Sequence, residues 1–186
     1  MRISYNSPVI LSFTFLSAAV YLTDVLFFGN LTKTFFTVYP GFSFLNPLDY
    51  LRLVSHAIGH GSWQHLLSNF TLILLIGPIL EEKYGSKDLL LMMFITALIT
   101  GVLNSFFFSH GLLGASGIVF MLIILSSITN IRQGQIPLTF ILITVLFLGQ
   151  EIVNMTRADN ISQTAHIIGG ICGGFFGLQF AKAKNE

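Results

Sequence analysis

The strongest constraint on this chain is its series of long apolar stretches, separated by short polar segments. They approach the roughly 20 residues that a helix needs to cross the hydrocarbon core of a bilayer. Charged residues make up only 9% of the chain, against roughly 25% in a typical soluble domain. We therefore expect an all-α membrane protein with six transmembrane helices. The expected helices are Pro8 to Phe28, Gln64 to Leu80, Leu89 to Phe108, Ser116 to Ile131, Ile136 to Met155 and Gln163 to Ala181.

The whole chain, residues 1–186, is expected to form a single membrane domain. The first apolar stretch continues past Asp24 without a clean small-x-small cleavage site, so we interpret it as a retained span rather than a signal peptide. Residues 29–63 then form a long first loop that is rich in Phe, Tyr and Pro. Aromatic rings favour the membrane interface, so we expect this loop to lie there, ahead of the remaining helices in residues 64–181.

The distribution of Lys and Arg predicts the orientation. With a cytoplasmic N-terminus, six cations lie inside and three outside, which is the direction that the positive-inside rule favours. The inner set is Arg2, Lys83, Lys87, Arg132, Lys182 and Lys184, and the outer set is Lys33, Arg52 and Arg157. Both termini are then cytoplasmic, and the compact size suggests a multi-pass protein of a bacterial inner membrane.

Charge and cysteine content exclude other classes. The net charge is +1 and the cations are scattered, so nucleic acid is not an expected partner. Cys172 is the only cysteine, which rules out an internal disulfide and a CxxC metal site. We interpret it as a small packing residue.

Four polar residues are expected at similar depth. His65 and Asn69 are four apart near the start of the second helix, Ser116 opens the fourth helix, and His166 lies one turn past the start of the sixth. These three helices run in the same direction, so their starts lie toward the same outer leaflet. Ionisable groups inside a membrane are costly and are candidates for function.

These residue types suit acyl transfer. A serine hydroxyl needs a neighbouring base, most often His, to take its proton during attack on a carbonyl. Ser116 is the candidate nucleophile and His166 the candidate base. The resulting oxyanion needs preorganised donors, for which we expect the backbone N–H of Ser116 and the side chains of His65 and Asn69.

Small residues predict close approach of the two helices that carry Ser116 and His166. Gly114 and Gly117 flank the serine, and a stripe of small residues recurs every four positions on the sixth helix. The stripe comprises Ala165, Gly169, Gly173 and Gly177, and Gly170 and Gly174 widen it.

Five ordered motifs resemble those of the rhomboid intramembrane proteases. They are Ser55-His56-Ala57-Ile58-Gly59-His60, Gln64-His65-Leu66-Leu67-Ser68-Asn69, Glu81-Glu82-Lys83-Tyr84-Gly85-Ser86, Gly114-Ala115-Ser116-Gly117 and Ala165-His166-Ile167-Ile168-Gly169. The resemblance covers roughly Leu51 to the C-terminus. It implies a six-helix rhomboid bundle and a Ser-His dyad without a third acid. It also implies cleavage of transmembrane or juxtamembrane segments of other membrane proteins.

The resemblance also assigns supporting residues. Arg52 matches the arginine of a Trp-Arg pair in the family's first loop, and Glu81 matches a structural acid after the second helix. Leu51 stands where that pair usually has Trp. Phe120 stands where many bacterial members have a Tyr against the catalytic ring, and it keeps the aromatic face without the hydroxyl.

Alternative functions make different demands on the sequence. His56 and His60 are four apart but lack the Glu of a zinc HExxH motif, so we interpret them as loop-packing or interface residues and expect no metal or cofactor. Asp24 and Glu151 form no paired-Asp site, and Glu151 is expected to accept a local hydrogen bond near the outer end of the fifth helix. A transporter would show paired charges or broken helices near the midplane, and we find neither in the sequence.

A proteolytically silent rhomboid-like protein that binds membrane helices remains the alternative function. Loss of the serine or the histidine would be its expected mark, and both are present. The expected partners are the lipid bilayer and transmembrane protein substrates, and no oligomer is required. We expect the fifth helix, with the segment Arg157 to Gln163, to form a mobile gate for substrate.

Overall fold

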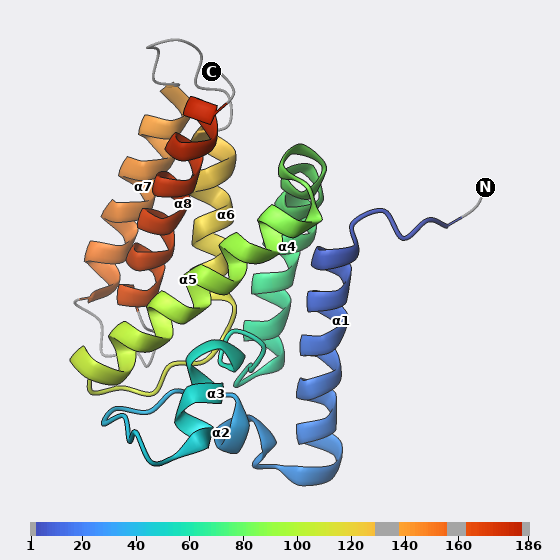
Figure 1. Cartoon of the computed structure of the whole chain (residues 1–186), viewed down its shortest axis with the longest axis vertical. Coiled ribbons are helices and arrows are strands. Elements are labelled where there is room, and N and C mark those ends of the chain that lie inside the picture. Colours follow the sequence, from blue (N-terminus) through green and yellow to red (C-terminus); the bar gives the residue numbers. More distant parts are fainter. Residues whose placement is uncertain (1–2, 129–137, 156–162, 184–186) are drawn as a thin grey trace.

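The computed structural model describes residues 3–128, 138–155 and 163–183, and these fold into a bundle of helices (Figure 1). The α-helices are α1 (Pro8–Thr23), α2 (Leu31–Phe35), α3 (Pro47–Ser55), α4 (Trp63–Tyr84), α5 (Ser86–Phe107), α6 (Ser116–Ile128), α7 (Leu138–Met155) and α8 (Gln163–Ala183). A π-helical turn, η1 (Asp24–Phe28), extends α1. The described residues contain no named strand, and a single β-bridge joins Val38 to Leu112.

Three helical segments are long and apolar enough to cross a membrane among the described residues. They are Pro8–Phe28, Trp63–Tyr84 and Ser86–Phe107, and the apolar α6 is shorter. Each of the six predicted apolar stretches overlaps one of the helices α1, α4, α5, α6, α7 and α8, and α4, α5 and α8 extend beyond the predicted bounds. The predicted end at residue 131 and the predicted start at residue 136 lie outside the described residues.

The helices reverse direction along the chain, so α4, α6 and α8 all begin at the ends that face α2 and α3 (Figure 1). α6 and α8 form the most extensive helix pair, and α6 also packs against α4 and α5. Its side chains Met121, Leu122 and Leu125 lie at the centre of the core and are almost wholly buried.

Glu81 joins three helices at the opposite end of the bundle. Its carboxylate oxygens accept hydrogen bonds from the backbone N–H groups of Val9 and Ile10, both at 3.0 Å. They also accept one from the hydroxyl of Ser86 at 2.7 Å. The first N–H groups of a helix have no partner within the helix, so this buried carboxylate on α4 caps α1 and holds the start of α5. These hydrogen bonds explain the structural role expected for Glu81.

The long first loop contains two helices, α2 and α3, that the sequence analysis did not predict. The carboxylate of Asp24 accepts hydrogen bonds from the N–H groups of Leu31 and Thr32, at 2.7 and 3.1 Å, at the start of α2. Arg52 on α3 donates to the carbonyl oxygen of Thr34 on the α2 side of the loop through Nε and Nη2, at 2.9 and 2.7 Å. The first contact joins α2 to the end of the first helix, and the second joins α2 to α3. The neighbouring Leu51 is half exposed.

Aromatic side chains of this loop gather beside the end of α5. The ring of Phe42 lies 5.0 to 5.5 Å from the rings of Phe44, Tyr50 and Phe106. Phe44, Tyr50 and Phe106 are exposed, and Phe42 is partly buried. This composition suits the interfacial position expected for residues 29–63.

Candidate active site

The start of α4 is fixed by a helix cap. The hydroxyl of Ser62 accepts a hydrogen bond from the backbone N–H of His65 at 3.1 Å, which satisfies one of the unpaired N–H groups of the first turn. His65 is partly buried, and Asn69, one turn further along, is buried. The cap therefore fixes the start of α4, whose first two turns carry both side chains.

The imidazole of His65 lies against the loop that precedes α6. Gly114 in this loop has a φ of +113°, a conformation that side chains disfavour. A methyl group added there would lie 2.6 Å from Nε2 of His65, so the ring occupies the space that any other residue would fill. His65 therefore contacts a residue that lies two positions before Ser116 in the sequence.

Ser116 is the first residue of α6 and is partly buried. The backbone N–H of Val119 donates to the carbonyl oxygen of Ala115 at 2.9 Å, the first hydrogen bond of the helix. The N–H groups of Ser116 and Gly117 precede it and have no acceptor within the helix. Such N–H groups carry the positive end of the helix dipole and favour a nearby anion.

The first turns of α6 and α8 touch at their backbones. A methyl group at Gly117 would lie 3.3 Å from the carbonyl oxygen of Ala165, and one at Gly169 would lie 2.8 Å from the carbonyl carbon of Gly117. A methyl group at Gly173 would lie 3.1 Å from the carbonyl carbon of Met121. The stripe of small residues on α8 therefore lies directly on α6, with Ser116 and His166 on adjoining turns.

The ring of His166 packs on Phe120. The two ring centroids are 4.4 Å apart with an interplanar angle of 37°, and His166 is 8% exposed. Phe120 lies one turn after Ser116 on the same helix. The aromatic face expected from the sequence is therefore present beside the candidate base, and it restricts the orientation of the imidazole.

Asn69 has a partner that the sequence analysis missed. Its side-chain nitrogen lies 3.1 Å from Nε2 of His60, whose Nδ1 lies 3.1 Å from the carbonyl oxygen of Ile58. These contacts fit the tautomer in which Nδ1–H donates to Ile58 and Nε2 accepts from Asn69. One of the two amide N–H groups of Asn69 is then used by His60.

His56 holds the loop before Ser116 from the other side. Its carbonyl oxygen accepts a hydrogen bond from the N–H of Gly114 at 2.9 Å, and its Nε2 faces the hydroxyl of Thr100 at 3.3 Å. Burial lowers the pKa of His56 to about 4. Burial, together with the nearby His65, also lowers the pKa of His60 to about 4. Both rings are therefore neutral at neutral pH.

The remaining predicted residues lie outside this cluster. Within the described ranges no group of three or more His, Cys, Asp or Glu side chains is placed to hold a metal ion. Cys172 is buried against the core. The side chain of Glu151 and most of the segment predicted as part of the gate, up to residue 162, lie outside the described residues.

The fold and site define a helical membrane protein in which Ser116 and the neighbouring histidines gather around the starts of α4, α6 and α8. Residues 47–183 match the Rhomboid domain family, and the chain belongs to this family. The family resemblance of the motifs is thereby confirmed.

Relatives from two genera carry the same name. The chain is 22% identical over 187 residues to the Rhomboid protease GlpG of Haemophilus influenzae, covering 99% of this chain and 96% of that protein. It is 27% identical over 177 residues to the Rhomboid protease GlpG of Yersinia pestis, covering 91% of this chain and 62% of that protein. The chain therefore spans less than two thirds of the Yersinia relative. The names of both relatives support the function of an intramembrane protease for this chain.

Proposed function

We propose that the protein is an intramembrane serine endopeptidase that cleaves transmembrane or juxtamembrane segments of other membrane proteins. The observation that carries this proposal is the backbone contact between the first turns of α6 and α8, at Gly117, Ala165 and Gly169. This contact puts Ser116 and His166 on adjoining turns, and Phe120 supports the imidazole from one face.

The proposed reaction proceeds through an acyl-enzyme. Oγ of Ser116 attacks the carbonyl carbon of the scissile peptide as its proton passes to His166. The tetrahedral intermediate collapses when the C–N bond breaks and His166 returns the proton to the leaving amine. Water then attacks the ester while His166 takes a water proton, and the C–Oγ bond breaks as Ser116 regains its hydrogen.

The proposed oxyanion donors surround the start of α6. They are the backbone N–H of Ser116, the imidazole of His65 and the side-chain amide of Asn69. The contact of His65 with Gly114 and the hydrogen bond from Asn69 to His60 support this assignment, since both restrict a side chain before substrate arrives. Donors that need no rearrangement are the ones that stabilise a developing charge most.

The proposed topology has six spans, α1, α4, α5, α6, α7 and α8, in a bacterial inner membrane with both termini cytoplasmic. We propose that substrate reaches the site between α4 and α7. Within the described residues α7 packs against α6 and α8 and has no packing contact with α4, which supports a lateral opening there. No oligomer is required, because the proposed catalytic groups all come from one chain.

Cleavage of a model transmembrane substrate in proteoliposomes tests the proposal. Ser116→Ala and His166→Ala should each abolish cleavage while leaving the thermal unfolding temperature near that of the wild type. Ser109→Ala is the matched control, because Ser109 is an exposed serine in the loop before α6. Cleavage by Ser116→Ala at the wild-type rate would overturn the proposal. Binding of the substrate without cleavage by the wild type would favour a proteolytically silent protein.

A further inference from the structure

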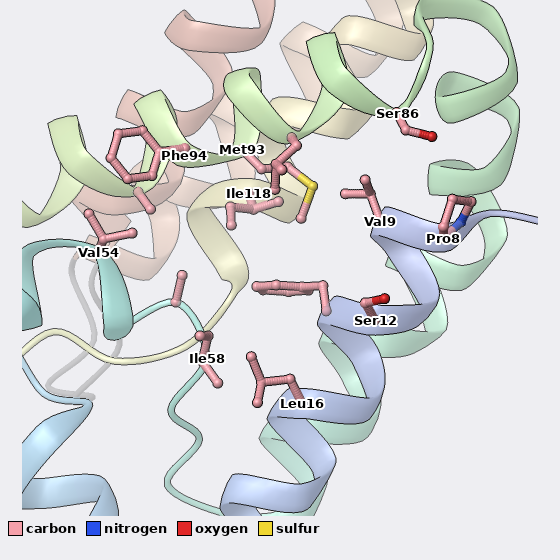
Figure 2. A pocket seen from close by; sticks show the side chains of 14 residues that line it. Pro8, Val9, Ser12, Leu16, Val54, Ile58, Ser86, Met93, Phe94 and Ile118 are labelled. Atoms are coloured by element: carbon pink, nitrogen blue, oxygen red, sulfur yellow. The ribbon is translucent and has the colours of Figure 1, made fainter.

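An apolar groove lies between α1 and α5. Its volume is about 520 Å³. The labelled side chains of Val9, Ile58 and Met93 surround the open space in Figure 2. The lining comes from α1, the end of α3 and the loop after it, α5, and Ile118 of α6. The groove is therefore built from segments far apart in the sequence.

The only hydroxyl groups among the lining side chains already have partners. Ser86 donates to Glu81 at 2.7 Å, and the hydroxyl of Ser12 lies 3.0 Å from that of Tyr5. The other lining residues have apolar side chains. Ordered water needs two to four polar partners, so this space suits neither water nor a polar ligand.

The length of the groove is close to the thickness of one leaflet. It begins at Pro8 and Ser86, at the starts of α1 and α5, and reaches Leu16 and Ala97. At a rise of about 1.5 Å per residue this is roughly 12 Å along α1 and roughly 16 Å along the oblique α5 (Figure 1), a little under half of a hydrocarbon core roughly 30 Å thick. The rim residues Leu16, Leu90 and Phe94 are 51%, 54% and 47% exposed, so the groove opens toward lipid.

The cross-section of the groove suits a hydrocarbon chain. A volume of about 520 Å³ spread over about 16 Å gives a mean cross-section of about 30 Å². A single unbranched hydrocarbon chain fits this space, whereas a helix about 10 Å across would rest on the rim. Leaving the space empty would also forfeit the dispersion contacts of its lining.

We infer that this groove binds one acyl chain of a phospholipid from the leaflet at the N-terminal end of α1. The headgroup remains at the membrane surface beside Pro8 and Ser86. The end of the chain contacts Ala57 and Ile58, next to His56, and Ile118, two residues after Ser116. The bound lipid therefore braces the segment that carries His56 and His60. This inference depends on membrane residence alone and not on the proposed proteolysis.

Native mass spectrometry after detergent exchange tests the inference. The wild type should retain one phospholipid per chain when phosphatidylethanolamine is the lipid supplied. Ser12→Phe and Ala97→Phe place a ring in the groove and should lose the lipid. Ala19→Phe is the matched control, because Ala19 is exposed on α1 and does not line the groove, and it should retain the lipid.

A thermal unfolding measurement gives a second readout. Phosphatidylethanolamine at about 100 times its dissociation constant should raise the unfolding temperature of the wild type by about 5 °C or more. The same lipid should leave the unfolding temperature of Ser12→Phe unchanged. Because Ser12 is exposed, this variant is expected to fold even if Ala97→Phe does not. Retention of the lipid by both groove variants, or a wild type that carries only detergent or a free fatty acid, would overturn the inference.

Discussion

Replacing Gly169 with alanine probes the contact on which the site depends. The added methyl group would lie 2.8 Å from the carbonyl carbon of Gly117 and closer still to its oxygen. Real Cβ atoms essentially never approach other atoms within 3.0 Å, and the atoms in the way belong to backbone rather than to a flexible side chain. α8 must therefore move away from α6 next to Ser116.

The geometry sets the size of the effect. An ordinary van der Waals contact begins at 3.4 Å, so restoring it requires a separation of the order of 1 Å. Overpacking of this kind costs about 1–3 kcal/mol of stability. A misplacement of about 1 Å between catalytic groups can lower the rate about 100-fold. We expect both losses in Gly169→Ala.

Gly174→Ala is the matched control on the same helix. A methyl group there would lie 4.0 Å from a side-chain carbon of Ile124, an ordinary contact, while the helix gains up to about 1 kcal/mol from the better propensity of alanine. Thermal unfolding in detergent and cleavage in proteoliposomes should therefore separate the two variants. If Gly169→Ala matched Gly174→Ala in both measurements, the close packing of α6 and α8 would not position the site.

Three further predictions concern buried polar groups. Glu81→Ala leaves three donors without their acceptor and should lower stability by about 2–4 kcal/mol, whereas Glu82→Ala at the exposed neighbouring position should change little. The pKa of about 4 for His56 and His60 lies below the ordinary 6.5. As the pH falls, these histidines therefore take up protons in the unfolded chain before they do so in the folded chain. The contribution of these histidines to the free energy of unfolding should be fully present above about pH 6.5 and should be lost as the pH falls toward 4. At about 1.4 kcal/mol per pH unit, the loss is about 3 kcal/mol per histidine. His60→Ala should lower kcat about tenfold with little change in KM, because Asn69 loses its orientation, and His60→Gln should restore part of the loss.

Each of these predictions can fail separately. Equal unfolding temperatures for the two glutamate variants would show that the cap on α1 contributes nothing. A flat stability profile between pH 6.5 and 4 would contradict burial of the two neutral imidazoles. Wild-type kcat in His60→Ala, with His110→Ala as an exposed histidine control, would remove the positioning role of His60.

The helices and the gathering of the polar residues could be predicted because both follow from simple patterns. Apolar length marks the spans, and alternating direction brings Ser116 and His166 to one end. The small residues every four positions on α8 indicated the face that lies on α6. The prediction that His65 lies near the serine likewise follows from its place at the start of α4.

The short helices α2 and α3 could not be predicted in the same way. Helices of five and nine residues are unstable alone and depend on tertiary contacts. Here those contacts come from Asp24 and Arg52, which reach residues seven to eighteen positions away. Asn46 followed by Pro47 was the available signal, since an Asn cap with Pro in the first turn favours a helix start.

The hydrogen bond between His60 and Asn69 left no sequence signal, because a separation of nine residues across a helix cap fits no helical repeat. The acyl-chain groove is likewise invisible in the sequence. Its lining consists of ordinary apolar residues, and only the packing of four segments leaves the space between α1 and α5 open.

The most direct test of the central claim is labelling with a serine-reactive fluorophosphonate in detergent, followed by mass spectrometric location of the adduct. We expect the wild type to carry one adduct, on Ser116. Ser116→Ala should carry none, and labelling of His166→Ala should be strongly reduced because the hydroxyl lacks its base. An adduct on another serine, or labelling of Ser116→Ala at the level of the wild type, would contradict the account.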